Sequence, residues 1–248
     1  MSEIIKDKGV VLKKRNFRET SKLVSIFSEN NGKINLIAKG VRTLKSKLSA
    51  VLEPMNFIEF VYYKKAARDL QFLSAADFLD DFTHIKSDFN KIQSAFAMLE
   101  LTNIFVHENE SNPVLFQKLV ESLTTLNNGS IKPKLMLIYY IVHLLDSGGY
   151  PVLHSFCPAC NKTLFDQNLE NYFSRHFGIV CTKCGKSNQE YYKLTKLQFE
   201  TITNSSLGRI SELDKNMFDD VILNETLGLL ENYIAQHVSE FKGFKSFV

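Results

Sequence analysis

The sequence lacks a hydrophobic run long enough to cross a bilayer. Its longest apolar stretch, Leu135 to Leu145, has 11 residues and includes His143, whereas a spanning helix needs about 20. The first nine residues are largely charged and lack the apolar core of a secretory signal. We therefore expect a cytoplasmic protein in which the Leu135 stretch is a buried helix.

Common catalytic signatures are also missing. The chain has no G-x-x-x-x-G-K-[ST] phosphate loop, no G-x-S-x-G nucleophile elbow and no H-E-x-x-H zinc pair. Asp80-Asp81 and Asp219-Asp220 are conceivable metal carboxylates of a nuclease. Both pairs fall near expected helix boundaries or surfaces, where acidic residues are commonly solvated. The sequence therefore predicts a protein that is not an enzyme.

Positive charge is unevenly distributed. Residues 1–80 carry 15 Lys and Arg against 9 Asp and Glu, although the whole chain has a net charge of only +3. Between residues 30 and 52 there are five basic residues and no acidic one. Such a stretch suits phosphate oxygens. A solvated loop, a membrane surface or an acidic protein partner are the alternatives that composition leaves open.

The first 80 residues have the pattern of strands. Five short apolar or alternating runs are separated by turns, among them Asn30-Asn31-Gly32, which favours a tight hairpin. Gly40 indicates a place where the third strand bends or leaves the sheet. Five strands in this length predict a small closed barrel such as an OB-fold, with an SH3-like barrel as the alternative.

Helical periodicity begins near residue 85. Asn112-Pro113 and Lys132-Pro133 predict helix starts, and the last helix carries an apolar stripe that needs a partner surface. We expect an α+β protein: an N-terminal five-stranded OB-fold barrel followed by a helical domain with an inserted four-cysteine zinc ribbon. The expected segments are the barrel (1–80), the first helical part (81–149), the zinc-ribbon insertion (150–190) and the second helical part (191–248).

All four cysteines lie in two C-x-x-C pairs separated by 20 residues. This spacing is typical of a zinc site, in which four thiolates complete a tetrahedral shell and leave no position for a reacting water. We therefore expect one structural zinc ion per chain, bound by Cys157, Cys160, Cys181 and Cys184. Gly185 is expected to permit a tight turn after the second pair. Paired redox motifs and four unliganded thiols are the alternatives.

Several blocks of sequence resemble the RecO family. They are Gly9 to Val24, Gly32 to Leu48 with Leu52-Glu53-Pro54, Gly149-Tyr150-Pro151 before the first cysteine pair, and Tyr233 to Ser246. The resemblance spans nearly the whole chain in order. It implies a recombination mediator in DNA repair that binds single- and double-stranded DNA and anneals complementary strands. It also implies the partners RecR and SSB, the single-stranded-DNA-binding protein, and indirectly the recombinase RecA.

The resemblance also assigns candidate DNA contacts. Lys39, Arg42, Lys45 and Lys47 occupy the most specific block, and Lys13, Lys14 and Arg15 are weaker candidates on the same barrel. Single-strand binders often add aromatic platforms; the candidates here are Phe17, Tyr62, Tyr63 and Phe72. The rival function is a zinc-ribbon interaction scaffold that does not bind DNA directly.

Overall fold

The computed structural model describes residues 3–43, 46–65, 68, 70–129, 131–164, 170–209 and 219–247. It divides into two compact units, Met1–Asn128 and Gly129–Val248. The first contains the barrel and its following helices, and the second contains the cysteines and the remaining helices. The finer division into four segments stays a prediction.

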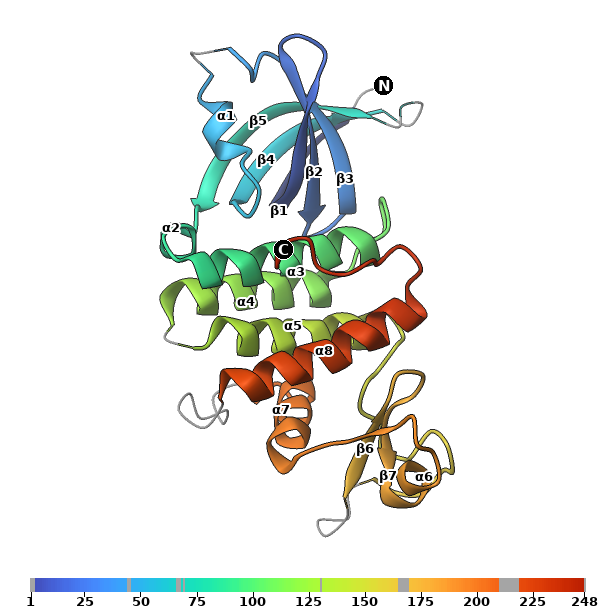
Figure 1. Cartoon of the computed structure of the whole chain (residues 1–248). Coiled ribbons are helices and arrows are strands. Elements are labelled where there is room, and N and C mark those ends of the chain that lie inside the picture. Colours follow the sequence, from blue (N-terminus) through green and yellow to red (C-terminus); the bar gives the residue numbers. More distant parts are fainter. Residues whose placement is uncertain are drawn as a thin grey trace. The chain divides into compact units, whose positions relative to one another are not determined.

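The N-terminal barrel is closed, with the strand order β1-β2-β3-β5-β4 (Figure 1). Its only parallel pair among these strands is β3 with β5. A short helix, α1 (Leu48–Val51), lies between β3 and β4 in the chain. This arrangement confirms the predicted OB-fold type of barrel. The strands are β1 (Glu3–Phe17), β2 (Ser21–Ser28), β3 (Gly32–Ala38), β4 (Phe57–Lys64) and β5 (Gln71–Asp80).

Alternate strand residues fill the barrel. Successive side chains of a strand point to opposite faces, so the apolar alternation of the sequence places every second residue inside. The interior is filled by apolar side chains that are at most 8% exposed, including those of Val11, Val24, Ile26, Ile34, Leu36, Ile58, Phe60 and Tyr62.

The β2–β3 hairpin is held by a buried carboxylate. Asp7 on β1 is 4% exposed and accepts hydrogen bonds from the hydroxyl of Ser28 and from the side-chain amides of Asn30 (2.9 Å) and Asn31 (2.7 Å). Gly32 has φ +68°, as a tight turn requires. The Asn-Asn-Gly turn therefore also supplies the polar partners of the strand beside it.

Three helices complete the first unit: α2 (Thr83–Lys86), α3 (Phe89–Phe105) and α4 (Pro113–Asn128). Asn112 caps α4, since its side-chain oxygen accepts from the backbone N–H of Leu115 at 3.1 Å. Two aromatic side chains of α3, Phe89 and Phe96, face outward. Phe89 is 72% exposed and Phe96 is 37% exposed, while small and aliphatic residues of the opposite face are buried.

The second unit is built around α5 (Pro133–Ser147), which is buried along most of its length. It packs against α7 (Lys196–Ser206) and α8 (Asp220–His237). The apolar stripe of the last helix thus packs back on an earlier helix, as expected. The small elements of this unit are β6 (Asn171–Ser174), β7 (Gly178–Cys181), α6 (Thr182–Lys186) and β8 (Tyr192–Lys193). Among the described helices, none is both long and apolar enough to cross a membrane.

Candidate nucleic-acid interface and metal centre

The four cysteines converge. Their sulfur atoms all lie within 4.8 Å of one another, and Cys157 and Cys181 are buried. Cys160 Sγ and Cys181 Sγ, from different pairs, are 3.5 Å apart. This cluster is a compact donor set of one chemical type, as a tetrahedral soft-metal site requires.

Local backbone geometry forms each half of the cluster. After Cys157 the chain turns back, because the Cys157 carbonyl accepts from the N–H groups of Cys160 (3.3 Å) and Asn161 (2.7 Å), with Asn161 at φ +59°. Cys181 ends β7 and Cys184 lies in α6. The backbone N–H of Cys181 also faces Cys157 Sγ at 3.4 Å. The two turns therefore direct their sulfurs to one point.

The thiols affect one another's ionisation. Burial raises the pKa of Cys181, but hydrogen bonds from the Cys184 backbone and neighbouring thiols outweigh it and bring that pKa to about 7. Burial and the neighbouring thiols raise the pKa of Cys184 to about 12. One negative charge is thus stabilised in the cluster and a second is opposed. A cation bound among the sulfurs would favour their ionised form.

Glycines near the cluster have different roles. Gly178 begins β7 at φ +70°, where an added Cβ would lie 2.3 Å from the backbone oxygen of Val152. The expectation for Gly185 was wrong in its reason: this residue is helical and not among the positive-φ glycines. Its Cβ would instead lie 2.1 Å from the Tyr172 ring. Gly185 is required because an aromatic ring of the small hairpin packs directly on the helix.

The predicted basic loop begins where β3 ends. Lys39, Arg42 and Lys47 are exposed, whereas Lys45 lies outside the described residues. Gly40 follows the end of β3 at φ +69°, in agreement with the predicted bend. Arg42 also braces the loop, because its Nη1 donates to the carbonyl of Arg18 at 2.7 Å. The remaining guanidinium donors of Arg42 stay available for an anion.

The three candidates on β1 are not equivalent. Lys13 and Arg15 are exposed, and they pair in register with the outward positions Ser25 and Leu23 of β2. Lys14, between them, is partly buried and forms an ion pair with Glu53. Lys13 and Arg15 are therefore exposed on the outer barrel surface, whereas Lys14 has an internal partner.

The structure also places the aromatic candidates. Tyr62 is inside the barrel, 2% exposed and stacked on Phe60, and burial raises its pKa to about 12. Tyr63 faces outward and is 41% exposed. Phe72 is partly exposed beneath the amine of Lys39, whose Nζ lies 4.2 Å from the ring centroid. Tyr63 and Phe72 lie side by side, since they are register partners on β4 and β5, whereas Phe17 is partly exposed at the end of β1, opposite Ser21.

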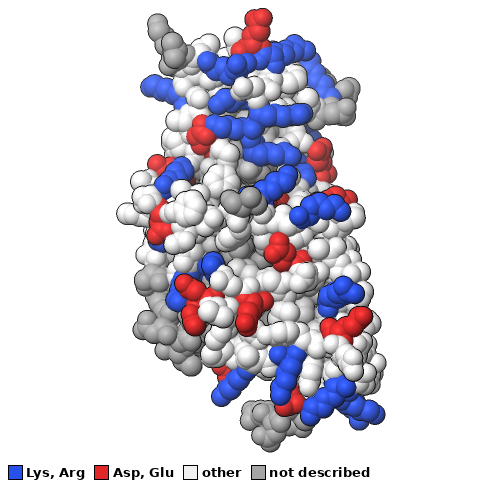
Figure 2. All heavy atoms as spheres, in the orientation of Figure 1, with Lys and Arg blue, Asp and Glu red and all other residues white. Residues whose placement is uncertain are grey.

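Additional basic side chains gather on the barrel. Figure 2 shows Lys and Arg spread across the visible face of the barrel. The pKa of Lys22 is lowered mainly by burial and secondly by the neighbouring positive charge of Lys14. The pKa of Lys33 is likewise lowered mainly by burial and secondly by the positive charge of Lys13. Arg68, which lies between β4 and β5 and is not among the predicted DNA contacts, lies with Lys39 over the Phe72 ring, 5.2 Å from its centroid. The run Lys64-Lys65 before it was the available signal.

The carboxylates considered for a nuclease have local partners. Asp80 accepts from the Phe82 backbone (2.8 Å) and Asp81 from the Thr83 hydroxyl (2.6 Å). Asp219 caps α8, and Asp220 pairs with a lysine, Lys132, at 3.0 Å. Within the described residues, the four cysteines are the only group of three or more metal-ligating side chains that converge.

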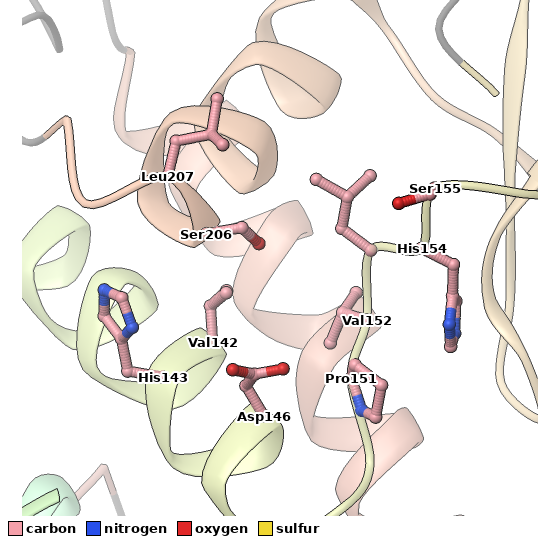
Figure 3. Close-up of a pocket in the computed structure, with 10 residues that line it drawn as sticks. Val142, His143, Asp146, Pro151, Val152, His154, Ser155, Ser206 and Leu207 are labelled. Atoms are coloured by element: carbon pink, nitrogen blue, oxygen red, sulfur yellow. The ribbon is translucent and has the colours of Figure 1, made fainter. Parts of the chain in front are cut away.

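A separate pocket of about 220 Å³ lies between α5, the end of α7 and the segment that leads to Cys157. Figure 3 shows His143 and His154 on opposite sides of this pocket. The two imidazoles and Asp146 line the same space but do not belong to a convergent metal-ligating group.

Comparison with known proteins agrees with this architecture. The family model described as recombination protein O N terminal matches residues 1–82, and the one described as recombination protein O C terminal matches residues 86–246. A protein of Clostridium perfringens named DNA repair protein RecO is 31% identical over 212 residues, which cover 85% of this chain and 84% of that protein. A protein of Acetivibrio thermocellus with the same name is 27% identical over 237 residues, or 95% and 92% of the two chains.

The fold and its sites define an OB-fold barrel protein with appended helices and a four-cysteine cluster. The chain belongs to the RecO family of DNA repair and recombination proteins. This family is one of repair mediators and is not a known enzyme class.

Proposed function

We propose that this protein is a non-catalytic recombination mediator that binds single- and double-stranded DNA on its barrel and anneals complementary strands. In this role it acts with RecR to load RecA onto DNA coated by SSB, in the cytoplasm at the nucleoid. The observation that carries the proposal is the outward placement of Lys13, Arg15, Lys39 and Arg42 on one OB-fold barrel.

The proposed mechanism is electrostatic. Lysine and arginine side chains that neutralise phosphates release counterions and lower the repulsion between two strands. Complementary bases then approach and pair without any bond being made or broken by the protein. The excess of basic residues in the first 80 positions supports this role for the barrel.

The four cysteines would hold one Zn²⁺ ion in a closed shell, and the ion would have a structural role. The β6–β7 hairpin beside them has two strands of four residues each, and its buried apolar side chains are limited to Tyr172, Phe173, Ile179 and Val180. Metal binding would therefore contribute directly to the folding of this region.

The test of DNA binding compares single-strand affinity at several salt concentrations. The variant replaces Lys39, Arg42, Lys45 and Lys47 by alanine. Four phosphate contacts predict a slope of log affinity against log salt near −3 for the wild type, and the variant should flatten it. The matched control removes four exposed lysines of the second unit, namely Lys162, Lys183, Lys196 and Lys242.

The control should keep the wild-type slope. If both four-residue variants bind as the wild type does, the loop is solvated surface and these contacts must be withdrawn. If the wild type itself does not bind DNA at low salt, the scaffold function is favoured instead.

A further inference from the structure

Strand pairing aligns six outward-facing side chains in one row around the barrel. The register pairs connect β1 to β2, β2 to β3, β3 to β5, β5 to β4 and β4 back to β1. On β2, β3 and β4 the neighbours Val24, Leu36, Ala38 and Tyr62 belong to the buried interior of the barrel, so Leu23, Ile37 and Tyr63 lie on the opposite face of their strands. The row, in order of pairing, is Arg15, Leu23, Ile37, Phe72, Tyr63 and Ile4.

The middle of the row is an aromatic surface. Phe72 and Tyr63 are direct cross-strand partners, and such pairs have Cβ atoms about 4.5–5.5 Å apart. Leu23 and Ile37 on one side are each 8% exposed and provide a packed floor. Tyr63 and Ile4 on the other side are 41% and 65% exposed. Two adjacent rings are thus held on neighbouring strands, with Tyr63 exposed to solvent and Phe72 partly exposed.

Two cations stand over this surface. Lys39 Nζ lies 4.2 Å and Arg68 Cζ lies 5.2 Å from the centroid of Phe72. Neither forms an ion pair with a carboxylate in the part of the chain that the structure describes. An aromatic face attracts such cations in the absence of a better partner. Their charge remains available for an anion that approaches the rings.

We propose that Phe72 and Tyr63 form a base-stacking site for single-stranded DNA, with Lys39 and Arg68 binding the phosphates next to the stacked bases. This inference rests on the proposed DNA binding of the barrel and adds a contact that charge alone does not supply. The ligand that matches both parts has flat apolar faces joined by regularly spaced anions. Unpaired nucleotides have this structure, whereas the bases of a duplex already stack on each other.

The proposed stacking site predicts effects on DNA binding that phosphate contacts alone do not. Stacking depends little on salt, so a variant that loses a ring should bind single strands more weakly at every salt concentration without a change in slope. Replacing Phe72 by leucine should weaken single-strand binding about tenfold. Tyr63→Leu should act in the same direction, and because Tyr63 is exposed its replacement does not endanger the barrel core.

The decisive experiment uses the absence of tryptophan from the chain. Phe72→Trp introduces a single tryptophan, which can be excited selectively over the tyrosines and whose emission is quenched when a base stacks on it. The full-length variant is titrated with a thymidine homopolymer, with an abasic homopolymer of the same length, and with an acidic peptide that contains phenylalanine. Phe78→Trp is the matched control, since Phe78 is on the same strand and 46% exposed but outside the row. Anisotropy of labelled oligomers measures binding independently.

We expect the thymidine homopolymer to quench Phe72→Trp, and the abasic polymer to bind without quenching it. Phe78→Trp should respond to neither. If anisotropy reports binding of both polymers but Phe72→Trp is not quenched, the stacking site is refuted while DNA binding by the barrel stands. If only the acidic peptide quenches, the row is a protein-binding surface and the proposal is wrong. If no polymer binds at low salt, the proposed function fails together with the site.

Discussion

Asp7 offers a quantitative test of how the barrel is held together. The replacement Asp7→Ala removes a carboxylate that is 4% exposed and accepts from Ser28, Asn30 and Asn31 and from the backbone of Lys8 at 2.8 Å. Hydrogen bonds to a charged group contribute about 1.5–3 kcal/mol each. The desolvation of the buried charge offsets part of this sum.

The side chains that donate to Asp7 are affected differently by the Asp7→Ala replacement. Asn30 is exposed and Asn31 is half-buried, so their amides can turn to water. Ser28 is fully buried; its hydroxyl would still accept from the backbone N–H of Asn31 (3.1 Å) but would lose the acceptor of its own proton. A buried unsatisfied donor costs about 1–3 kcal/mol. With one or two charge-assisted bonds also lost, we expect Asp7→Ala to lower the free energy of unfolding of the barrel by about 2–4 kcal/mol.

Urea unfolding followed by far-ultraviolet circular dichroism measures this loss. Asp7→Asn keeps the shape but exchanges an acceptor for a donor, so its effect should lie between wild type and alanine. Asp77→Ala is the control, because Asp77 is exposed on β5. A loss for Asp7→Ala no larger than for Asp77→Ala would refute the idea that this buried carboxylate stabilises the hairpin.

The remaining predictions concern the metal centre and alkaline stability. Metal analysis of protein purified without chelator should give one zinc per chain. Cys181→Ser should release the zinc and unfold mainly the β6–β7 region, so that the protein loses solubility before it loses DNA binding. Metal-free folded protein with four reactive thiols would contradict this prediction. Burial raises the pKa of Tyr62 to about 12 and that of Tyr233 to about 12, so the folded state keeps these protons longer than the unfolded chain. Stability should therefore fall as pH rises from about 10 to 12, and Tyr62→Phe should reduce that fall; an unchanged alkaline unfolding profile would argue against it.

Local patterns were sufficient for most of the secondary structure. Alternation of apolar and polar residues identified the barrel strands because a strand with one buried face has no other way to arrange them. The capping role of Asn112 and the buried helix after Lys132-Pro133 also follow from neighbouring residues alone. The cysteine cluster could also be predicted from local sequence, since each C-x-x-C turn forms its half of the site from adjacent residues.

Other features depend on residues distant in sequence. The outward aromatics of α3 share the helical period of the core residues, and periodicity does not say which face the rest of the chain covers. Lys13 and Lys14 belong to the same basic run and cannot be distinguished by sequence. Lys14 is nevertheless on the inward side of β1, where it forms an ion pair with Glu53. Arg68 was not recognised because its significance depends on Phe72.

The barrel, the helical region, the cysteine cluster and the family could be predicted from the chain, because each is encoded by local periodicity, local turns or ordered blocks of similar residues. Which side chains share a surface could not be predicted, because it depends on how distant strands pair. Closing the barrel requires the parallel pairing of β3 with β5, whose register brings Ile37 beside Phe72. That register depends on the packing of the whole barrel, so no segment read alone contains it.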